Sequence, residues 1–273
     1  MNRGVSMDVD REEEKLPLTE HLGELRKRIV VSLVAVLVTF SITFAFSEEI
    51  FRLIMFPLKY NLDFSVRELY VQFVPQDKLQ NTKLVFLAPA EAFWMNLKVA
   101  FVAGLILALP VIFLQVWKFI APGLLSHEKK YVLPFIIVAT VLFLFGAAFC
   151  FFIVLPFAMG FLLTYKVGDF LMPMLSVGQY VDFCLKFILA FGAVFELPVI
   201  IVFLTRMGIV TPKGLARNRK YAALVAFVVA AFLTPTPDAF NQILMALPIM
   251  VLYELGIWIS PLFARRRQDA AGA

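Results

Sequence analysis

The sequence predicts an all-α integral membrane protein with six transmembrane helices and both termini in the cytoplasm. Of the 273 residues, 61% are hydrophobic and only 16% are charged, and the apolar residues gather in long uncharged runs. A soluble domain of this length could not cover so much apolar surface, whereas an integral membrane protein does not need to. We therefore expect the lipid bilayer to surround most of the chain.

The first three apolar runs define the first three predicted spans. A membrane-spanning helix needs about twenty predominantly apolar residues. Ile29–Phe46 and Val99–Val116 each supply an uncharged run close to this length. Val132–Tyr165 is longer, and we expect one helix that ends near Pro156, where the ring interrupts helical hydrogen bonding, followed by an interfacial segment.

The last three predicted spans lie in the second half of the chain. Phe187–Thr205 is the fourth and contains one acid, Glu196. The fifth, Tyr221–Leu233, has only about thirteen residues before the "TPTPD" sequence at 234–238. The two prolines stop a helix and the aspartate favours the start of the next one, so we expect short fifth and sixth helices.

The distribution of basic residues predicts the orientation. Segments 1–28, 115–131, 206–221 and 264–273 carry six, three, five and three Lys or Arg. The alternate segments 47–91, 161–180 and 234–238 carry five, one and none. The positive-inside rule therefore places both termini in the cytoplasm.

The ends of the chain differ from the apolar middle. Residues 1–15, which include "REEEK", are expected to form a disordered cytoplasmic tail, and residues 264–273 a basic cytoplasmic tail. Residues 16–263 form the predicted membrane domain. The first apolar run follows a long polar leader and precedes a poor cleavage site, so we interpret it as an uncleaved span.

Two stretches rich in basic residues also contain acids, which a purely basic segment beside a membrane span would not need. In "LPLTEHLGELRKRIV", 16–30, apolar residues at helical spacing predict an amphipathic helix on the membrane surface that carries Glu24. In "WKFIAPGLLSHEKKYVLPF", 117–135, Glu128 is the single acid. Surface ion pairs with basic neighbours would also explain both acids.

Other chemistry has weaker support. The two histidines lack the spacing of a metal site. Cys150 and Cys184 are interpreted as small packing residues rather than as a disulfide or a metal-binding pair. Basic residues lie at the ends of apolar runs rather than in a stripe, so no nucleic-acid partner is expected. The chain contains no phosphate-binding GxxxxGK[ST] loop and no visible internal repeat.

Five motifs occur in a specific order along the chain: "HLGELRKR" (21–28), "APAEAFWMNLKVA" (88–100), "QVWKFIAPGLLSHEKK" (115–130), "FGAVFELP" (191–198) and "LTPTPDAFNQ" (233–242). They closely resemble TatC, the polytopic receptor subunit of the twin-arginine protein translocase. The likeness runs from about residue 17 to 260. It implies a curved, concave wall of helices and a non-enzymatic transport function in the bacterial inner membrane, without catalytic residues, metal or cofactor.

The resemblance also implies roles for individual residues. Glu24 and Glu128 match the acids that bind the twin-arginine signal peptide of folded precursors. Two guanidinium groups require two carboxylates within reach. The other matching positions are His21, Arg26 and Phe119 on the same surface, Pro57 in the first periplasmic segment, and Asp238 and Gln242 for partner binding. The implied partners are TatA- and TatB-type single-span proteins and further copies in a larger complex, and the implied energy source is the proton-motive force.

Glu196 matches the family's intramembrane acid, which points into the concave face. At that depth it could gather water, thin the bilayer or meet a polar group of a partner helix. It could instead pair internally with Gln242 or Gln179 and fix a bend above Pro198.

Two rival functions would use the embedded acids differently. A proton-coupled small-molecule transporter would use Glu196 as its proton carrier, with Glu254 a weak candidate for the second ionisable group. An intramembrane hydrolase would need an embedded Ser/Lys, paired Asp or HExxH set, which the sequence lacks.

Two features depart from the family pattern. Residues 58–87 are longer than expected, and the alternating "ELYVQFV" predicts a short hairpin there. Asn241 stands where the family more often has serine.

Overall fold

A computed structural model of the chain describes residues 18–65, 70–75, 84–120, 132–164, 175–234, 236 and 238–263. Within these residues, five helices are long and apolar enough to cross a membrane. They are Leu22–Ala45, Glu91–Ile120, Leu133–Leu163, Val177–Arg206 and Ala239–Leu262. The predicted tails, 1–15 and 264–273, lie outside the described residues, so their predicted disorder stays a prediction.

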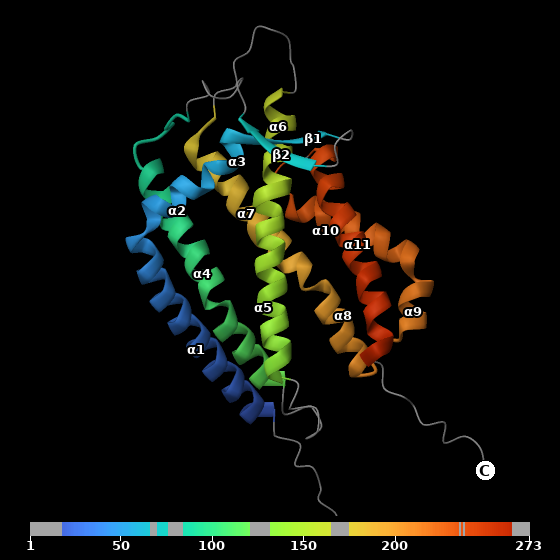
Figure 1. The fold of residues 1–273 in the computed structure, drawn as a ribbon. Helices are drawn as coiled ribbons and strands as arrows, with labels where there is room; N and C mark the ends of the chain where they lie inside the picture. Colours follow the sequence, from blue (N-terminus) through green and yellow to red (C-terminus); the bar gives the residue numbers. More distant parts are fainter. Residues whose placement is uncertain are drawn as a thin grey trace, which may run out of the picture.

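The two ends of the helical bundle differ (Figure 1). The start of α1 and the end of α11 lie at one end, which we call the terminal end. The two strands lie at the other, which we call the hairpin end. The chain crosses between them along α1 (Leu18–Ala45), α4 (Glu91–Ile120), α5 and α6 (Val132–Phe149 and Leu155–Thr164), and α7 and α8 (Val177–Phe195 and Leu197–Arg206). Helix α10 (Arg219–Leu233) then leads back towards the hairpin end, and α11 (Ala239–Phe263) returns to the terminal end.

Helix α1 (Leu18–Ala45) is one continuous helix of 28 residues that packs along α4 (Glu91–Ile120). The expected surface helix over 16–30 is therefore wrong as a separate element, because the described part of this stretch continues into the span without a break. Thr39 and Thr43 of α1 donate to the carbonyl oxygens of Gly104 and Ala100 of α4 at 2.8 and 2.7 Å. These hydrogen bonds require the backbones of α1 and α4 to lie close together, which the small residues Gly104 and Ala100 permit.

Two short helices and a hairpin follow α1. Helix α2 (Ser47–Ile54) leads into α3 (Phe56–Lys59), which holds Pro57 buried in its first turn. A proline suits this position because the first amide of a helix has no acceptor within the helix. Strands β1 (Tyr60–Ser65) and β2 (Tyr70–Pro75) then pair antiparallel, which gives a hairpin inside the segment where alternation predicted one.

The third span continues through Pro156, so the predicted helix end there is wrong. Helix α5 (Val132–Phe149) passes through a π-helical turn, Cys150–Val154, into α6 (Leu155–Thr164). A proline cannot donate to the carbonyl four residues earlier and its ring crowds that group. A π-helical turn is wider than an α-helical turn, and the one just before Pro156 makes room for the proline ring. Prolines and π-bulges are both common causes of local irregularity in helices.

The fourth span is broken at Glu196. Helix α7 (Val177–Phe195) ends there and α8 (Leu197–Arg206) begins with Pro198 in its first turn. Helix α7 is the most buried part of the bundle and holds the fully buried rings of Tyr180, Phe187 and Phe191. The Tyr180 hydroxyl donates to the carbonyl oxygen of Ile54 at 2.6 Å and so ties α7 to α2.

The lengths of the last two long helices differ in part from the prediction that the fifth and sixth helices are both short. After α9 (Pro212–Arg217), α10 (Arg219–Leu233) has 15 residues, a rise of about 22 Å against a hydrocarbon core of about 30 Å. It is short, as predicted, and it is not one of the five helices long and apolar enough to cross a membrane, so six full-length spans are not found among the described residues. Helix α11 (Ala239–Phe263) has 25 residues, so the expectation of a short sixth helix is wrong. Two prolines lie inside α11, and neither ends it.

Glu91 joins the α4 start to the α7 start at the hairpin end. Its carboxylate accepts hydrogen bonds from the Ser176 hydroxyl, from the Gly178 amide at 2.7 Å and from the Leu87 amide at 2.6 Å. Beside it, Val85 forms a parallel bridge with Ser176. One side chain thus satisfies the free amides that precede α4 and open α7.

The close α1–α4 contact predicts a destabilising substitution. A Cβ at Gly104 would stand 2.8 Å from the backbone nitrogen and Cα of Phe40, which cannot move aside as a flexible side chain could. We expect Gly104→Ala to lower the free energy of unfolding by about 1–3 kcal/mol, as overpacking does. Gly23→Ala in α1 is the matched control, since nothing lies within 4 Å of its Cβ. Equal melting temperatures of the two variants in detergent would contradict this close packing.

Candidate functional site

The first candidate site lies at the terminal end, where α1 and α4 meet. Arg28 Nη2 donates to Glu24 Oε1 at 2.7 Å, and Arg28 Nη1 lies 3.5 Å from Gln115 Oε1 on α4. The Arg28 and Glu24 side chains are 24% and 23% exposed, and Gln115 is buried. One turn of α1 therefore presents a half-buried carboxylate that already holds a guanidinium group.

Aromatic residues hold the α4 end of this site in place. Trp117 is buried, with its ring centroid 4.9 Å from those of Phe135 on α5 and Phe203 on α8. Phe119, predicted to belong to the site, lies half-buried one turn beyond Gln115. The third and fourth spans thus hold the end of α4 in place.

The other predicted members of this site are placed only in part. Arg26 is exposed on α1, two residues beyond Glu24. Glu128 and the His21 side chain lie outside the described residues, so their approach to Glu24 stays a prediction. Sequence reasoning missed Arg28 and Gln115 as members; the i, i+4 spacing of Glu24 and Arg28 was the available signal for the first.

The second candidate site is Glu196, at the break between α7 and α8. It is 9% exposed, and its Oε1 atom has no hydrogen-bond partner among the residues that the structure describes. A buried polar atom without a partner in a native protein calls for an explanation, because burial without hydrogen bonding costs free energy.

Neither internal partner considered for Glu196 takes that role. Gln242 donates through Nε2 to the carbonyl oxygen of Phe227 at 3.1 Å. Gln179 lies 17 residues earlier along α7, a rise of about 26 Å. The break itself follows from Pro198, which stands at the start of α8 and cannot donate to the preceding turn.

A third polar cluster surrounds the start of α11. Asp238 accepts from the Asn241 amide at 2.7 Å, as an N-cap does, and from Asn241 Nδ2 at 2.9 Å. Asn241 Nδ2 also donates to the Thr236 hydroxyl at 2.8 Å, and Asn241 is fully buried. Asn241 thus helps to hold the turn that places Asp238 and Gln242.

These hydrogen bonds set the protonation of Asp238. Partial burial raises the pKa of its carboxyl, but the hydrogen bonds from Asn241, Thr236 and the Phe240 amide outweigh burial and leave the pKa below its ordinary value. The carboxylate is therefore held in its charged form.

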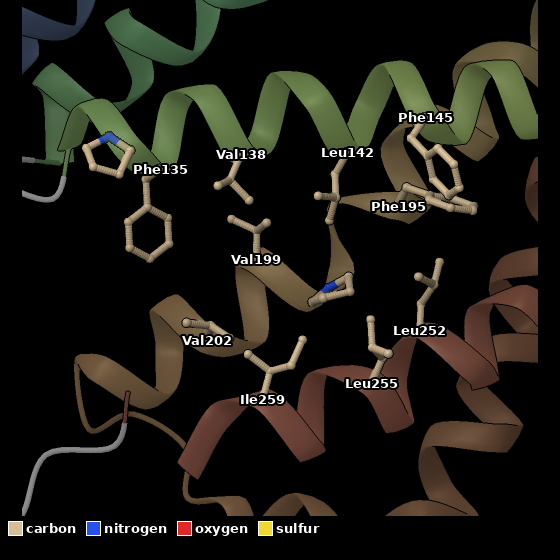
Figure 2. Close-up of a pocket in the computed structure, with 12 residues that line it drawn as sticks. Phe135, Val138, Leu142, Phe145, Phe195, Val199, Val202, Leu252, Leu255 and Ile259 are labelled. Carbon is tan, nitrogen blue, oxygen red and sulfur yellow. The ribbon is translucent and has the colours of Figure 1, made fainter. Parts of the chain in front are cut away.

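An apolar cavity of about 460 Å³ lies between α5, α8 and α11. Figure 2 shows side chains from these helices pointing into it, with Phe195 at one end and Phe135 at the other. All of its lining side chains are apolar, so it offers no polar group to orient a polar solute. It does not provide the substrate site that a small-molecule transporter would need.

Among the described residues, no group of three or more His, Cys, Asp or Glu is arranged to hold a metal ion. Cys150 and Cys184 are both buried and not bonded to each other. Together with the five long apolar helices, this arrangement defines a polytopic membrane protein.

Comparison with known proteins gives this class a family. The family model for the Sec-independent protein translocase protein TatC matches residues 20–248. The TatC protein of Desulforapulum autotrophicum is 41% identical over 261 residues, covering 96% of this chain and 90% of that protein. The TatC protein of Aquifex aeolicus is 38% identical over 255 residues, covering 93% and 98%.

The fold agrees. The crystal structure described as the twin arginine translocase receptor TatC superposes with a TM-score of 0.74 at 37% identity, covering 90% of this chain and 100% of that one. The chain belongs to the TatC family and is a non-enzymatic component of the twin-arginine translocase. The proton-coupled transporter and the hydrolase are thereby set aside.

The Asp238 cluster predicts a pH-dependent contribution to stability. Because the folded-state pKa is lowered, the contribution is present above the ordinary pKa of about 3.9 and is lost as the pH falls towards the folded value. Asp238→Asn keeps a good N-cap without the charge. We expect the melting temperature of wild type to exceed that of Asp238→Asn at pH 6, and the gap to narrow as the pH falls below the ordinary pKa of about 3.9. A gap that does not change with pH would contradict the charged carboxylate.

Proposed function

We propose that this protein is the receptor that binds twin-arginine signal peptides of folded precursors at the cytoplasmic face of a bacterial inner membrane. The terminal end is then cytoplasmic and the hairpin end periplasmic. TatA- and TatB-type single-span proteins, together with further copies of this chain, assemble with it to move the cargo outward, using the proton-motive force. The family membership and the positive-inside count support this proposal.

One observation carries the recognition step: the half-buried Glu24 carboxylate already holds the guanidinium group of Arg28 at 2.7 Å. A carboxylate can accept from more than one guanidinium N–H, and partial burial strengthens such charge-assisted bonds. Glu24 thus has the chemistry and the surroundings to bind an incoming arginine. Glu128 supplies the second carboxylate in the proposal.

The proposal predicts how signal-peptide binding responds to substitution. We expect Glu24→Ala and Glu128→Ala each to weaken binding by about 1.5–3 kcal/mol, roughly 10- to 150-fold, since each removes a hydrogen-bonded charge. Asp should be milder than Gln because it keeps the charge. The measurement is co-purification of the full chain with a twin-arginine peptide. A Lys-Lys peptide is the ligand control, and Glu49→Ala on α2, at the opposite end, is the matched protein control.

The binding experiment also decides the proposal as a whole. If both Ala variants retain the peptide like wild type, or if the Lys-Lys peptide binds equally well, twin-arginine recognition at this surface is wrong.

Glu196 is proposed to hold water and to meet a polar group of a partner within the membrane. We expect Glu196→Gln to preserve more transport than Glu196→Leu, since Gln keeps size and hydrogen bonding. Leu should leave the fold intact, because it removes the cost of burying a carboxyl group without a partner. Signal-peptide binding should survive both changes. Transport by Glu196→Asp alone, with Glu196→Gln inactive, would instead indicate a proton carrier.

A further inference from the structure

The side chain of Arg28 occupies the carboxylate that the proposed function assigns to an arginine of the signal peptide. Its Nη2 atom donates to Oε1 of Glu24, four residues earlier on α1, at 2.7 Å. Both side chains are half-buried. An arginine of a peptide that binds here therefore meets a carboxylate that already holds a guanidinium group of the protein itself.

The Arg28–Glu24 contact is looser than the other Arg–Glu pair among the described residues. Arg219 meets Glu254 at two points, from Nε to Oε1 at 2.7 Å and from Nη2 to Oε2 at 2.8 Å. Arg28 donates to one oxygen of Glu24 through one nitrogen. Two parallel hydrogen bonds are the stronger geometry for a guanidinium group and a carboxylate. The contact within the recognition site is thus the one more easily exchanged.

The rest of the Arg28 guanidinium group is incompletely satisfied. Its Nε atom is buried and has no acceptor among the residues that the structure describes. Its Nη1 atom lies 3.5 Å from Gln115 Oε1, at the long limit for a hydrogen bond. A buried donor without an acceptor costs free energy, so the present position of the group does not use all of its hydrogen-bonding capacity.

Gln115 supplies a second acceptor for Arg28. It is buried near the end of α4, which packs along α1. A rotation of the Arg28 side chain is enough to shorten the 3.5 Å contact towards the usual 2.9 Å, and neither helix has to move. The guanidinium group therefore has two acceptors on opposite sides, one of which the proposed ligand needs.

We infer that Arg28 is a resident competitor for the Glu24 carboxylate and moves to Gln115 when an arginine of the signal peptide binds. The inference rests on the proposed function and adds a specificity-determining residue to it. Bidentate binding of the incoming guanidinium group requires both oxygens of Glu24, including the one that Arg28 now holds. A lysine ammonium group offers no such two-point match. Arg28 thus sets a threshold that a guanidinium group passes more readily than an ammonium group.

The first test removes the competitor. The dissociation constant of a fluorescent twin-arginine peptide is measured by anisotropy on the full chain in nanodiscs. Arg28→Met should bind the peptide about two- to fivefold more tightly than wild type, because a partly exposed ion pair no longer has to break. A Lys-Lys peptide should gain as well, since the same oxygen is freed. Arg28→Lys keeps a cation beside Glu24 and should stay close to wild type.

The controls separate this effect from a general change in charge or fold. Arg217→Met removes an exposed arginine of α9, on the opposite side of the bundle from α1 (Figure 1), and should leave binding unchanged. The melting temperature of each variant checks its fold. Arg28→Ala serves as a second variant, because its effect on peptide binding should have the same sign.

The second test examines the acceptor. Gln115→Leu should weaken twin-arginine binding about two- to fivefold in the wild-type background, because the released guanidinium group loses its new partner. The same change should have no effect in the Arg28→Met background. Binding by Arg28→Met that is equal to or weaker than that of wild type would show that Arg28 positions Glu24 for the peptide, and overturns the inference. An equal effect of Gln115→Leu in both backgrounds, including none, overturns it too.

The same assay keeps the proposed function separate. If wild type prefers the twin-arginine peptide over the Lys-Lys peptide and Glu24→Ala weakens binding, the proposed function stands whatever Arg28→Met does. If wild type does not distinguish the two peptides, the proposed function fails independently of Arg28.

Discussion

The hydrocarbon core of a membrane offers no water to hydrogen-bond, so each polar group inside it must find its partner within the protein. Most of the fold depends on this constraint. Helices α1 and α4 are continuous, and the hydroxyl groups of Thr39 and Thr43 return to backbone carbonyls. Where Pro156 removes a donor, the chain widens into a π-helical turn and remains helical. Among the described spans only the fourth breaks, at Glu196, and there a buried oxygen atom is left without a partner among the described residues.

The same constraint explains which parts of the fold the sequence could predict. Apolar runs locate spans because the requirement for backbone hydrogen bonding acts locally, and all five long helices coincide with predicted runs. The ends of elements were less predictable. Rules for proline come from helices in water, where a broken helix can hydrogen-bond to solvent. In lipid that alternative is absent, so α11 continues past Pro248 and α6 past Pro156.

Some residues of the candidate sites could be predicted from the sequence, and their contact partners could not. Glu196 could be recognised because it is an acid in an apolar run, which a single sequence displays, whereas Glu24 and Asp238 were assigned through the resemblance to TatC. Their partners could not be found so directly. The contacts of Arg28 with Gln115, Lys98 with Asp182 and Ser176 with Glu91 join residues 84 to 87 positions apart. Such pairs depend on the relative rotation of packed helices, which side-chain packing sets and the order of residues does not reveal.

Some charged side chains of this protein have an ion-pair partner within the chain and stabilise the fold. Others have none among the described residues and are available to contact other molecules. Glu24 has Arg28 and Asp182 has Lys98, each within 2.7 Å, so folding has already offset part of the cost of removing these charges from water. Glu196 and Lys186 have no such partner in the part of the chain that the structure describes; Glu196 is buried, whereas Lys186 is exposed. Their separation of about 15 Å prevents them from neutralising each other. The exposed ammonium group of Lys186 can extend towards water or lipid headgroups on its flexible chain, whereas the buried oxygen atom of Glu196 leaves a cost that the described residues do not offset.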